Sequence, residues 1–291
     1  MSITVISVAI LVGITVLLVP LYSSSKQNHS KSDTAAPTST STTIKSWANS
    51  LDIVASSRVG KIEGAVLDMS TGTQWQFGGT TPMVTASIIK LTIADTLLSQ
   101  GKDISQLGKS ILDELAPMIE ESSNNAATFL WNQVGGSAGI YQFDKEIGLS
   151  NTKVSSCVQC PGFPWPGWGL TLSTPSDQIK VLQNIFEPSK LVSSSSQAYL
   201  MNLMSNVVPS ERWGISSGPD KNSRVWLKNG WLPMSGSGNW QINSVGKVSS
   251  PGHQYLIALM SSENPSMAYG IDSIEMVSQK IWELVSSNYR E

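Results

Sequence analysis

Apolar residues recur at three- and four-residue spacing through most of the chain beyond residue 43, a period typical of helices that bury one face. In the first such segment Ile44, Trp47, Leu51 and Val54 share one face, and Gly60 ends the pattern. The same spacing predicts further helices at 87–99, 104–115, 124–134, 137–147, 174–186, 197–207 and 268–285. The middle of the domain is therefore expected to be an all-helical insertion.

Short segments rich in β-branched residues predict strands instead. They cover residues 61–69, 74–78, 224–229, 239–248 and 253–261, with a turn at 70–73. The order of helix, two strands, helical insertion, three strands and helix predicts an α+β fold. We expect one antiparallel sheet flanked by the N- and C-terminal helices, plus an all-helical subdomain.

The first 22 residues contain no charged side chain. Residues 3–22 are long enough to span a bilayer as a helix, so we predict a transmembrane signal anchor or a signal peptide at 1–22. No basic side chain precedes this segment and no Ala-x-Ala site follows it, which favours an uncleaved anchor. Residues 23–43 are rich in Ser and Thr and predict a disordered tether to a domain at 44–291. We expect that domain outside the cytoplasm, held at the cell membrane by the anchor or secreted if the N-terminus is cleaved.

The charge balance and the scarcity of histidine exclude several classes of function. The chain has 19 basic and 21 acidic residues without a basic cluster, so no nucleic-acid partner is expected. Of its two histidines, His29 lies in a low-complexity segment and His253 begins a predicted strand. Neither suits a Ser-His-Asp triad or a histidine metal site, so we expect no metal and no other cofactor. If the chain performs nucleophilic chemistry, we expect its base to be a lysine. We expect the protein to be a monomer.

Residues 148–172 have no periodicity, and both cysteines lie in this loop. Such a long loop in a compact domain is usually functional or disordered, and its tryptophans argue against disorder. Cys157 and Cys160 form a single C-x-x-C motif, with no second pair to complete a zinc site. Outside the cell a disulfide is the expected state, with free thiols as the open alternative.

Three short motifs follow one another along the predicted domain. Ser87-Ile-Ile-Lys90 lies at the start of a predicted helix, which places its serine and lysine on one face. On its own this motif is better explained by an N-cap serine followed by a solvated lysine. Ser122-Ser-Asn124 lies between two predicted helices, and Lys228-Asn-Gly230 ends a predicted strand. Together, the order and placement of the motifs indicate a serine nucleophile with lysine partners.

This arrangement resembles the class A β-lactamase and penicillin-binding protein superfamily over roughly residues 44–288. The chain is similar, more closely, to β-lactamase-like exported serine hydrolases of Gram-positive bacteria. That closer resemblance rests on residues 118–127, on Glu211-Arg-Trp-Gly214 and on Lys228-Asn-Gly-Trp-Leu-Pro233. It implies a serine hydrolase whose partner is a small-molecule β-lactam or a peptide-like amide such as a cell-wall peptide.

The resemblance implies catalytic roles for Ser87, Lys90 and Ser122. Ser87 would form the acyl-enzyme, and because its hydroxyl is a weak acid, a neighbour must take its proton. Lys90 would be that base if burial and nearby positive charge lower its pKa. Ser122 would relay a proton to the leaving nitrogen.

The resemblance also implies which residues hold the substrate. Asn124 would bond the substrate amide, and Lys228 would hold a substrate carboxylate while placing positive charge beside the base. The oxyanion hole would consist of the backbone N–H groups of Ser87 and Trp231. Gly230 would leave room for the acyl group on an edge strand with which a peptide could pair.

Two residues depart from the family pattern. Ser123 stands where class A enzymes usually have aspartate, and Asn229 stands where threonine or serine is usual. Ser87 and Ser122 are also closer in sequence than in typical class A enzymes, so the helical insertion is expected to be trimmed.

A third departure concerns release of the acyl group. Class A β-lactamases use a loop glutamate to activate the water that clears the acyl-enzyme. Residues 147–186 contain no glutamate, and their one aspartate, Asp177, lies inside a predicted helix. Glu120, Glu121 and Glu211 could substitute, but each is more typical of a solvated surface carboxylate. The sequence therefore predicts slow deacylation.

Three interpretations of the domain remain. The first is an anchored serine acyl hydrolase, which could be a DD-peptidase-like cell-wall enzyme. The second is a penicillin-sensing or penicillin-binding module in which acylation is the end point. The third is a scaffold with a vestigial site. The presence of Ser87, Lys90, Ser122 and Lys228 favours an enzyme.

Overall fold

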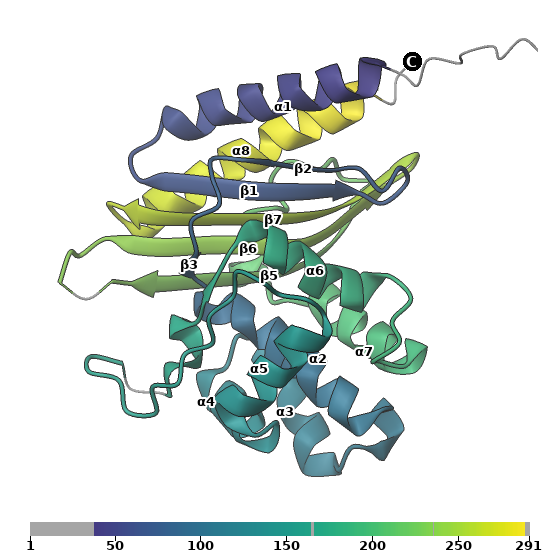
Figure 1. Ribbon diagram of the computed structural model, residues 1–291, viewed down its shortest axis with the longest axis vertical. Helices are drawn as coiled ribbons and strands as arrows, with labels where there is room; N and C mark the ends of the chain where they lie inside the picture. The colour runs from purple at the N-terminus through teal and green to yellow at the C-terminus, as the bar shows by residue number, and fades with distance from the viewer. Residues whose placement is uncertain (1–37, 164–165, 235, 289–291) are drawn as a thin grey trace, which may run out of the picture. The chain divides into compact units, whose positions relative to one another are not determined.

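The computed structural model describes residues 38–163, 166–234 and 236–288 (Figure 1). The predicted membrane segment at 1–22 lies outside these residues, as does most of the predicted tether. Within the described ranges, no helix is both long and apolar enough to cross a membrane. The first helix, α1 (Thr38–Ser56), begins before residue 44. The last residues of the segment expected to be a disordered tether are therefore helical.

A five-stranded antiparallel sheet forms the centre of the domain, in the strand order β2-β1-β7-β6-β5. Its members are β1 (Lys61–Asp68), β2 (Gln74–Phe77), β5 (Arg224–Pro233), β6 (Trp240–Ser250) and β7 (His253–Asn264). This confirms the predicted antiparallel sheet, although β5 extends beyond the expected end at residue 229. β5 pairs with β6 alone and therefore forms an edge of the sheet.

Alternate residues of each strand enter two separate apolar layers, because successive side chains of a strand point to opposite faces. Val66 and Ile257 are cross-strand partners in one layer, and Ala65 and Ala258 are partners in the other. The layer that contains Val66 also contains apolar residues of α1 and of α8 (Met267–Asn288). Figure 1 shows these two helices, purple and yellow, over the same face of the sheet. The terminal helices thus flank the sheet as predicted.

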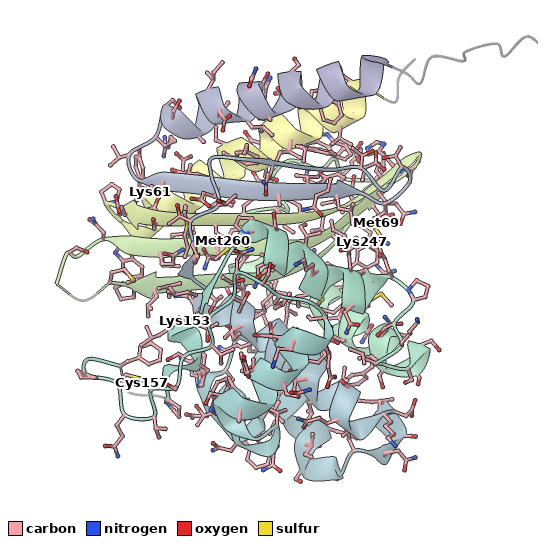
Figure 2. All side chains as sticks on the ribbon, in the orientation of Figure 1. Lys61, Met69, Lys153, Cys157, Lys247 and Met260 are labelled. Carbon is pink, nitrogen blue, oxygen red and sulfur yellow. A yellow bond between two sulfur atoms is a disulfide. The ribbon has the colours of Figure 1, made fainter. Side chains whose placement is uncertain are left out.

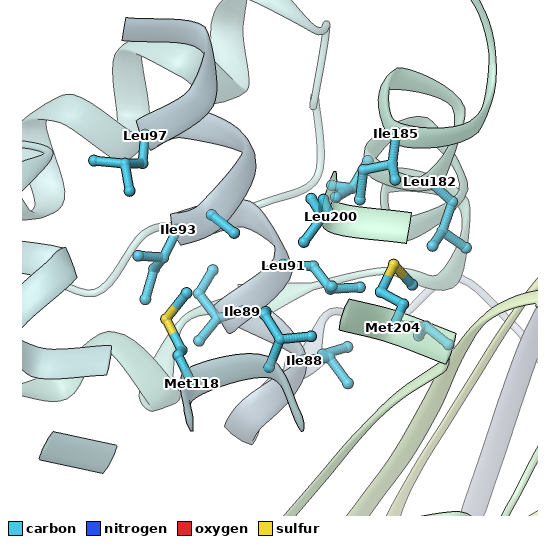
Figure 3. Close-up of a cluster of buried hydrophobic side chains, with 14 of the residues drawn as sticks. Ile88, Ile89, Leu91, Ile93, Leu97, Met118, Leu182, Ile185, Leu200 and Met204 are labelled. Carbon is cyan, nitrogen blue, oxygen red and sulfur yellow. The ribbon is translucent and has the colours of Figure 1, made fainter. Parts of the chain in front are cut away.

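The other face of the sheet is covered by the predicted helical subdomain. Its helices are α2 (Ile89–Gly101), α3 (Lys109–Glu120), α4 (Asn124–Gln133), α5 (Gly136–Glu146), α6 (Pro175–Phe186) and α7 (Ser194–Ser205). At its centre is α2, in which all residues from Ile89 to Leu98 are buried. Figure 3 shows Met118 of α3 on one side of α2, near Ile93, and Leu200 of α7 on the other side, near Leu91. Lys90 lies in the first turn of this buried helix and is therefore held in the interior of the domain.

β3 (Met83–Val84), which precedes α2 in the sequence, pairs with β4 (Leu172–Ser173) in a short antiparallel ribbon. This ribbon was not predicted, because two-residue strands leave no periodic pattern. β4 follows the long loop, in which Cys157 and Cys160 are joined by a disulfide. Figure 2 shows Cys157 where this loop extends away from the sheet. The loop also contains a 3₁₀ turn, Gly167–Leu170, that returns the chain to the helical subdomain.

Candidate active site

Ser87 lies in a tight turn between the β3–β4 ribbon and α2. This turn, Ala86–Ile88, is a 3₁₀ helix, so the α-helix expected from residue 87 begins only at Ile89. Ala86 has a φ of 47°, a left-handed value that a side chain rarely adopts. Backbone held in such a conformation is often found at functional sites, where the surrounding structure enforces it. Ser87 itself is partly exposed, so its hydroxyl is accessible.

Two buried amides on β6 hold this turn in place. The side chain of Asn243 donates to the backbone carbonyls of Val84 and Thr85, at 2.9 and 2.8 Å. Gln241 in turn donates to the Asn243 side-chain oxygen at 2.9 Å, which fixes the orientation of that amide. Neither residue was predicted from the sequence. The available signal was two amides at alternate positions of one predicted strand, which places them on one face.

Gly230 on β5 lies directly against the backbone of the Ser87 turn. A Cβ at position 230 would be 2.8 Å from the backbone nitrogen of Ser87, 2.9 Å from that of Ile88 and 2.9 Å from the carbonyl of Thr85. These are backbone atoms and cannot rotate away. Glycine is thus needed for the approach of the edge strand itself, whereas the sequence suggested that it leaves room for an acyl group. The contact places Trp231 beside the same turn.

Lys90 is fully buried and surrounded by oxygen acceptors from the second motif. Its Nζ donates to the backbone carbonyl of Ser122, lies 3.1 Å from Ser122 Oγ and donates to Asn124 Oδ1 at 2.8 Å. The ring of Trp168 covers the amine at 5.1 Å. Lys90 is therefore a positioned interior amine and not the solvated lysine that the S-x-x-K motif alone would suggest.

Ser122 lies between the two lysines. Its Oγ accepts a hydrogen bond from Lys228 Nζ at 2.9 Å, opposite the contact with Lys90. Ser122 has a φ of 53°, a second left-handed residue in the site. The next residue, Ser123, caps α4 by accepting from the backbone N–H of Ala126. An N-cap accepts serine and aspartate about equally, which explains how serine can replace the usual aspartate here.

Burial lowers the pKa of both lysines, and the charge of Lys228 lowers that of Lys90 further. Burial, followed by the charge of Lys228, lowers the pKa of Lys90 to about 6, and the carboxylate of Glu211 acts in the opposite direction. Burial also lowers the pKa of Lys228 to about 8, against the stabilising charge of Glu211. At neutral pH Lys90 is thus largely a neutral amine and Lys228 largely a cation.

Glu211 does not match its expected role as a solvated surface carboxylate. Its Oε2 lies 3.5 Å from Lys228 Nζ, and its side chain is only 14% exposed. The segment that carries it is fastened by Asn229, whose amide donates to the backbone carbonyls of Glu211 and Trp213 at 2.7 and 3.0 Å. Asn229 therefore faces this segment, a structural role for the residue that replaces threonine or serine.

A pocket of about 220 Å³ opens at Ser87. Besides Ser87 and Asn124, its lining residues are largely apolar or aromatic: Ala86, Phe163, Trp168, Gly169, Trp231, Leu232, Pro233 and Trp240. The structure thus brings Ser87, Asn124 and Trp231 to one pocket, while Lys90, Ser122 and Lys228 form a buried network beside it. Phe163 and Trp168 come from the long loop that carries the Cys157–Cys160 disulfide, so a tryptophan of that loop lines the pocket.

No carboxylate lines this pocket within the described part of the chain. Asp177, the aspartate in the expected region of the loop glutamate, is fully buried. It accepts hydrogen bonds from the backbone of Asn151 and the hydroxyl of Thr152, and it pairs with Lys180. These contacts give Asp177 a structural role in holding the start of the long loop. Among the described residues there is likewise no cluster of His, Cys, Asp or Glu suited to a metal ion.

The chain is similar in sequence to the protein named "Putative lipoprotein LppW" of Mycobacterium tuberculosis and Mycobacterium bovis, with 29% identity over 204 residues. The aligned region covers 68% of this chain and 62% of LppW, so the chain matches less than two thirds of that relative's length.

Solved structures share the fold at lower sequence identity. A mutant of PBP-A, solved as an acyl-enzyme complex with penicillin G, superposes with a TM-score of 0.71 and 19% identity, over 84% of this chain and 97% of that one. The TLA-1 extended-spectrum β-lactamase gives a TM-score of 0.74 at 17% identity, over 83% and 99%. A class A β-lactamase from Bacteroides cellulosilyticus gives 0.73 at 16%, over 84% and 99%.

The family model described as the β-lactamase enzyme family matches residues 103–285, more than half of the chain. The matched segment includes Ser122, Asn124 and the Lys228–Gly230 motif, and it begins after the Ser87 turn. The chain belongs to the β-lactamase enzyme family.

Proposed function

We propose that this chain is an extracytoplasmic serine hydrolase that forms a covalent acyl-Ser87 intermediate with β-lactam or peptide-like amide substrates and releases it slowly. The observation that supports this most strongly is the buried Lys90–Ser122–Lys228 network beside the pocket at Ser87. Two buried lysines do not stabilise the fold, because moving an amine out of water costs free energy. The value of the network is chemical, as it supplies a neutral base next to a serine.

Acylation would begin with proton transfer from Ser87 to Lys90. In the neutral amine, two N–H groups are taken by the Ser122 carbonyl and Asn124 Oδ1, which leaves one lone pair. This lone pair accepts the Ser87 proton as Oγ attacks the substrate carbonyl carbon. The backbone N–H groups of Ser87 and Trp231 are placed to receive the oxyanion, since Gly230 lets β5 approach the turn.

Collapse of the tetrahedral intermediate would return this proton to the leaving group. The ammonium group of Lys90 rotates about its Cε–Nζ bond to direct a proton to Ser122 Oγ, which lies 3.1 Å from Nζ. Ser122 gives its own proton to the departing nitrogen and takes one from Lys90, so the C–N bond breaks without leaving an anion. Lys228 donates to Ser122 Oγ at 2.9 Å and holds the hydroxyl in place throughout.

Release of the acyl group requires an activated water, and the pocket offers no carboxylate for this within the described residues. We therefore propose slow deacylation. The same observation supports the second candidate, a penicillin-binding module in which the acyl-enzyme is the end point. The fold it shares with PBP-A and β-lactamases is compatible with both.

The location we propose is outside the cytoplasm and associated with the membrane. Two features support it: the apolar segment at residues 3–22, and the description of the relative LppW as a putative lipoprotein. The chain has no cysteine near its N-terminus for lipid attachment, so the proposed anchor is the apolar segment itself.

The site assignment is tested by mass spectrometry after incubation with benzylpenicillin. We expect the intact protein to gain the mass of one benzylpenicillin, and proteolytic mapping to place the adduct on Ser87. Ser87→Ala should abolish the adduct while the variant keeps its melting temperature, because Ser87 is partly exposed. An adduct at another residue, or equal labelling of the variant, would refute the proposed nucleophile.

A further inference from the structure

Two hydrogen bonds and an ion pair already engage Lys228 within the protein. Its Nζ donates to Ser122 Oγ at 2.9 Å and to the backbone carbonyl of Asn229 at 3.2 Å. The carboxylate of Glu211 balances its charge, with Oε2 3.5 Å from Nζ. A substrate carboxylate would have to displace one of these partners to reach the cation.

Lys228 is also inaccessible from the pocket. Its side chain is 0% exposed, and it does not contribute to the pocket surface. No other described residue replaces it there, since none of the residues lining the pocket is charged. The nearby Arg212 directs its guanidinium to the backbone carbonyls of Ser205 and Val225, at 3.0 and 3.1 Å. The positive charge that the sequence suggested for binding a carboxylate is thus neutralised inside the protein.

The walls of the pocket favour an uncharged ligand for an independent reason. The aromatic side chains of Phe163, Trp168, Trp231 and Trp240 line it together with Leu232 and Pro233. Apolar surface of this kind gains free energy by covering apolar groups, and it loses free energy when it strips water from a charge.

We propose that Glu211 is a specificity-determining residue that occupies the carboxylate-binding capacity of Lys228, so that the enzyme prefers acyl donors without a carboxylate near the scissile amide. This inference rests on the proposed acylation of Ser87 and narrows its substrate class. The preferred donors are uncharged, apolar amides or esters, such as an internal peptide bond, and the disfavoured donors are those that end in a free carboxylate.

The test compares benzylpenicillin with its methyl ester, two compounds that differ in this one charge. The second-order rate constant for acylation of Ser87 is measured for each by intact-mass spectrometry. We expect the wild-type protein to react at least tenfold faster with the ester. In Glu211→Gln, which removes the negative charge with little change of shape, we expect the ester-to-acid ratio to fall by at least tenfold.

Two further variants separate charge from structure. Glu211→Asp retains a carboxylate and should retain the preference for the ester. Glu121→Gln removes an exposed carboxylate from the end of α3 and should leave the ratio at the wild-type value. A wild-type protein that reacts equally fast with both compounds, or faster with the acid, would overturn the inference, and this comparison needs no variant to fold. An unchanged ratio in folded Glu211→Gln would also overturn it. Failure of both compounds to label Ser87 would instead refute the proposed function.

Discussion

At the scale of single residues, the chemistry of the site depends on a lysine whose pKa is far from its ordinary value. Lys90 is buried, and its nearest charged neighbour of like sign is Lys228. Both effects favour the neutral amine, so the group that would be a surface cation elsewhere is a base at neutral pH. Glu211 limits the shift, because its charge favours the protonated form of both lysines.

This account predicts the pH dependence of acylation. Below its pKa of about 6 Lys90 is protonated and cannot accept the Ser87 proton, so the rate should rise with pH. An increase of roughly tenfold is expected between pH 5 and pH 7 for a single base of this pKa. Above about pH 7 Lys90 is almost wholly neutral, so the rate should level off.

The measurement is the second-order acylation rate constant from pH 5 to pH 10, with the reaction of the probe with Ser87→Ala subtracted at each pH. An acylation rate constant that rises only above pH 9 would show that Lys90 has the pKa of an ordinary lysine. In that case the proposed base would be wrong even if Ser87 is acylated.

At the scale of secondary-structure elements, the site is built where three elements meet: the turn before α2, the loop before α4 and the edge strand β5. Sequence periodicity predicted the helices and strands that flank these positions, because α2 and the central strands are long and strongly apolar. It did not predict the β3–β4 ribbon or the 3₁₀ form of the Ser87 turn. Those features are fixed by Asn243 and by the close approach of Gly230, which are contacts between segments remote in sequence.

The approach of β5 to the turn predicts a large effect of Gly230→Ala. The added methyl group would overlap backbone atoms of Ser87 and Ile88 unless β5 moves away. Such a shift would separate the two N–H groups of the proposed oxyanion hole, and loss of one such donor typically lowers rates by about 100- to 1,000-fold. We expect a decrease of about this size in the acylation rate constant, measured with benzylpenicillin methyl ester.

Gly108→Ala is the matched control, because a Cβ at position 108 meets no atom within 4 Å and its φ of −65° suits alanine. It should acylate at the wild-type rate. Equal rates for the two variants would contradict the placement of β5 against Ser87.

At the scale of the whole molecule, the sequence motifs predicted the family and the fold, and both are confirmed. The environment of Glu211 could not be predicted from the sequence. A lone Glu in a segment without periodicity is usually solvated, and the Lys228 contact arises only when that segment folds against β5. In the sequence, the tryptophans of the long loop argued only against disorder, and the position of an aromatic pocket at Ser87 depends on the return of that loop to the turn.

The molecule as a whole combines the groups that we propose for acylation with a pocket that lacks a carboxylate for release within its described lining. Asp177 was the one acidic residue in the region where the family has its deacylating glutamate. Its hydrogen bonds to Asn151 and Thr152 give it a structural role instead. Glu211 is engaged with Lys228 and is not free to activate water. We therefore predict an acyl-enzyme that accumulates.

The most direct test of this central claim is time-resolved intact-mass spectrometry of the wild-type protein with excess benzylpenicillin, followed by removal of the free compound. We predict near-complete conversion to a single adduct on Ser87, which then persists well beyond the time needed to form it. Steady loss of the antibiotic without an accumulated adduct would contradict the claim, because it would mean that deacylation outpaces acylation.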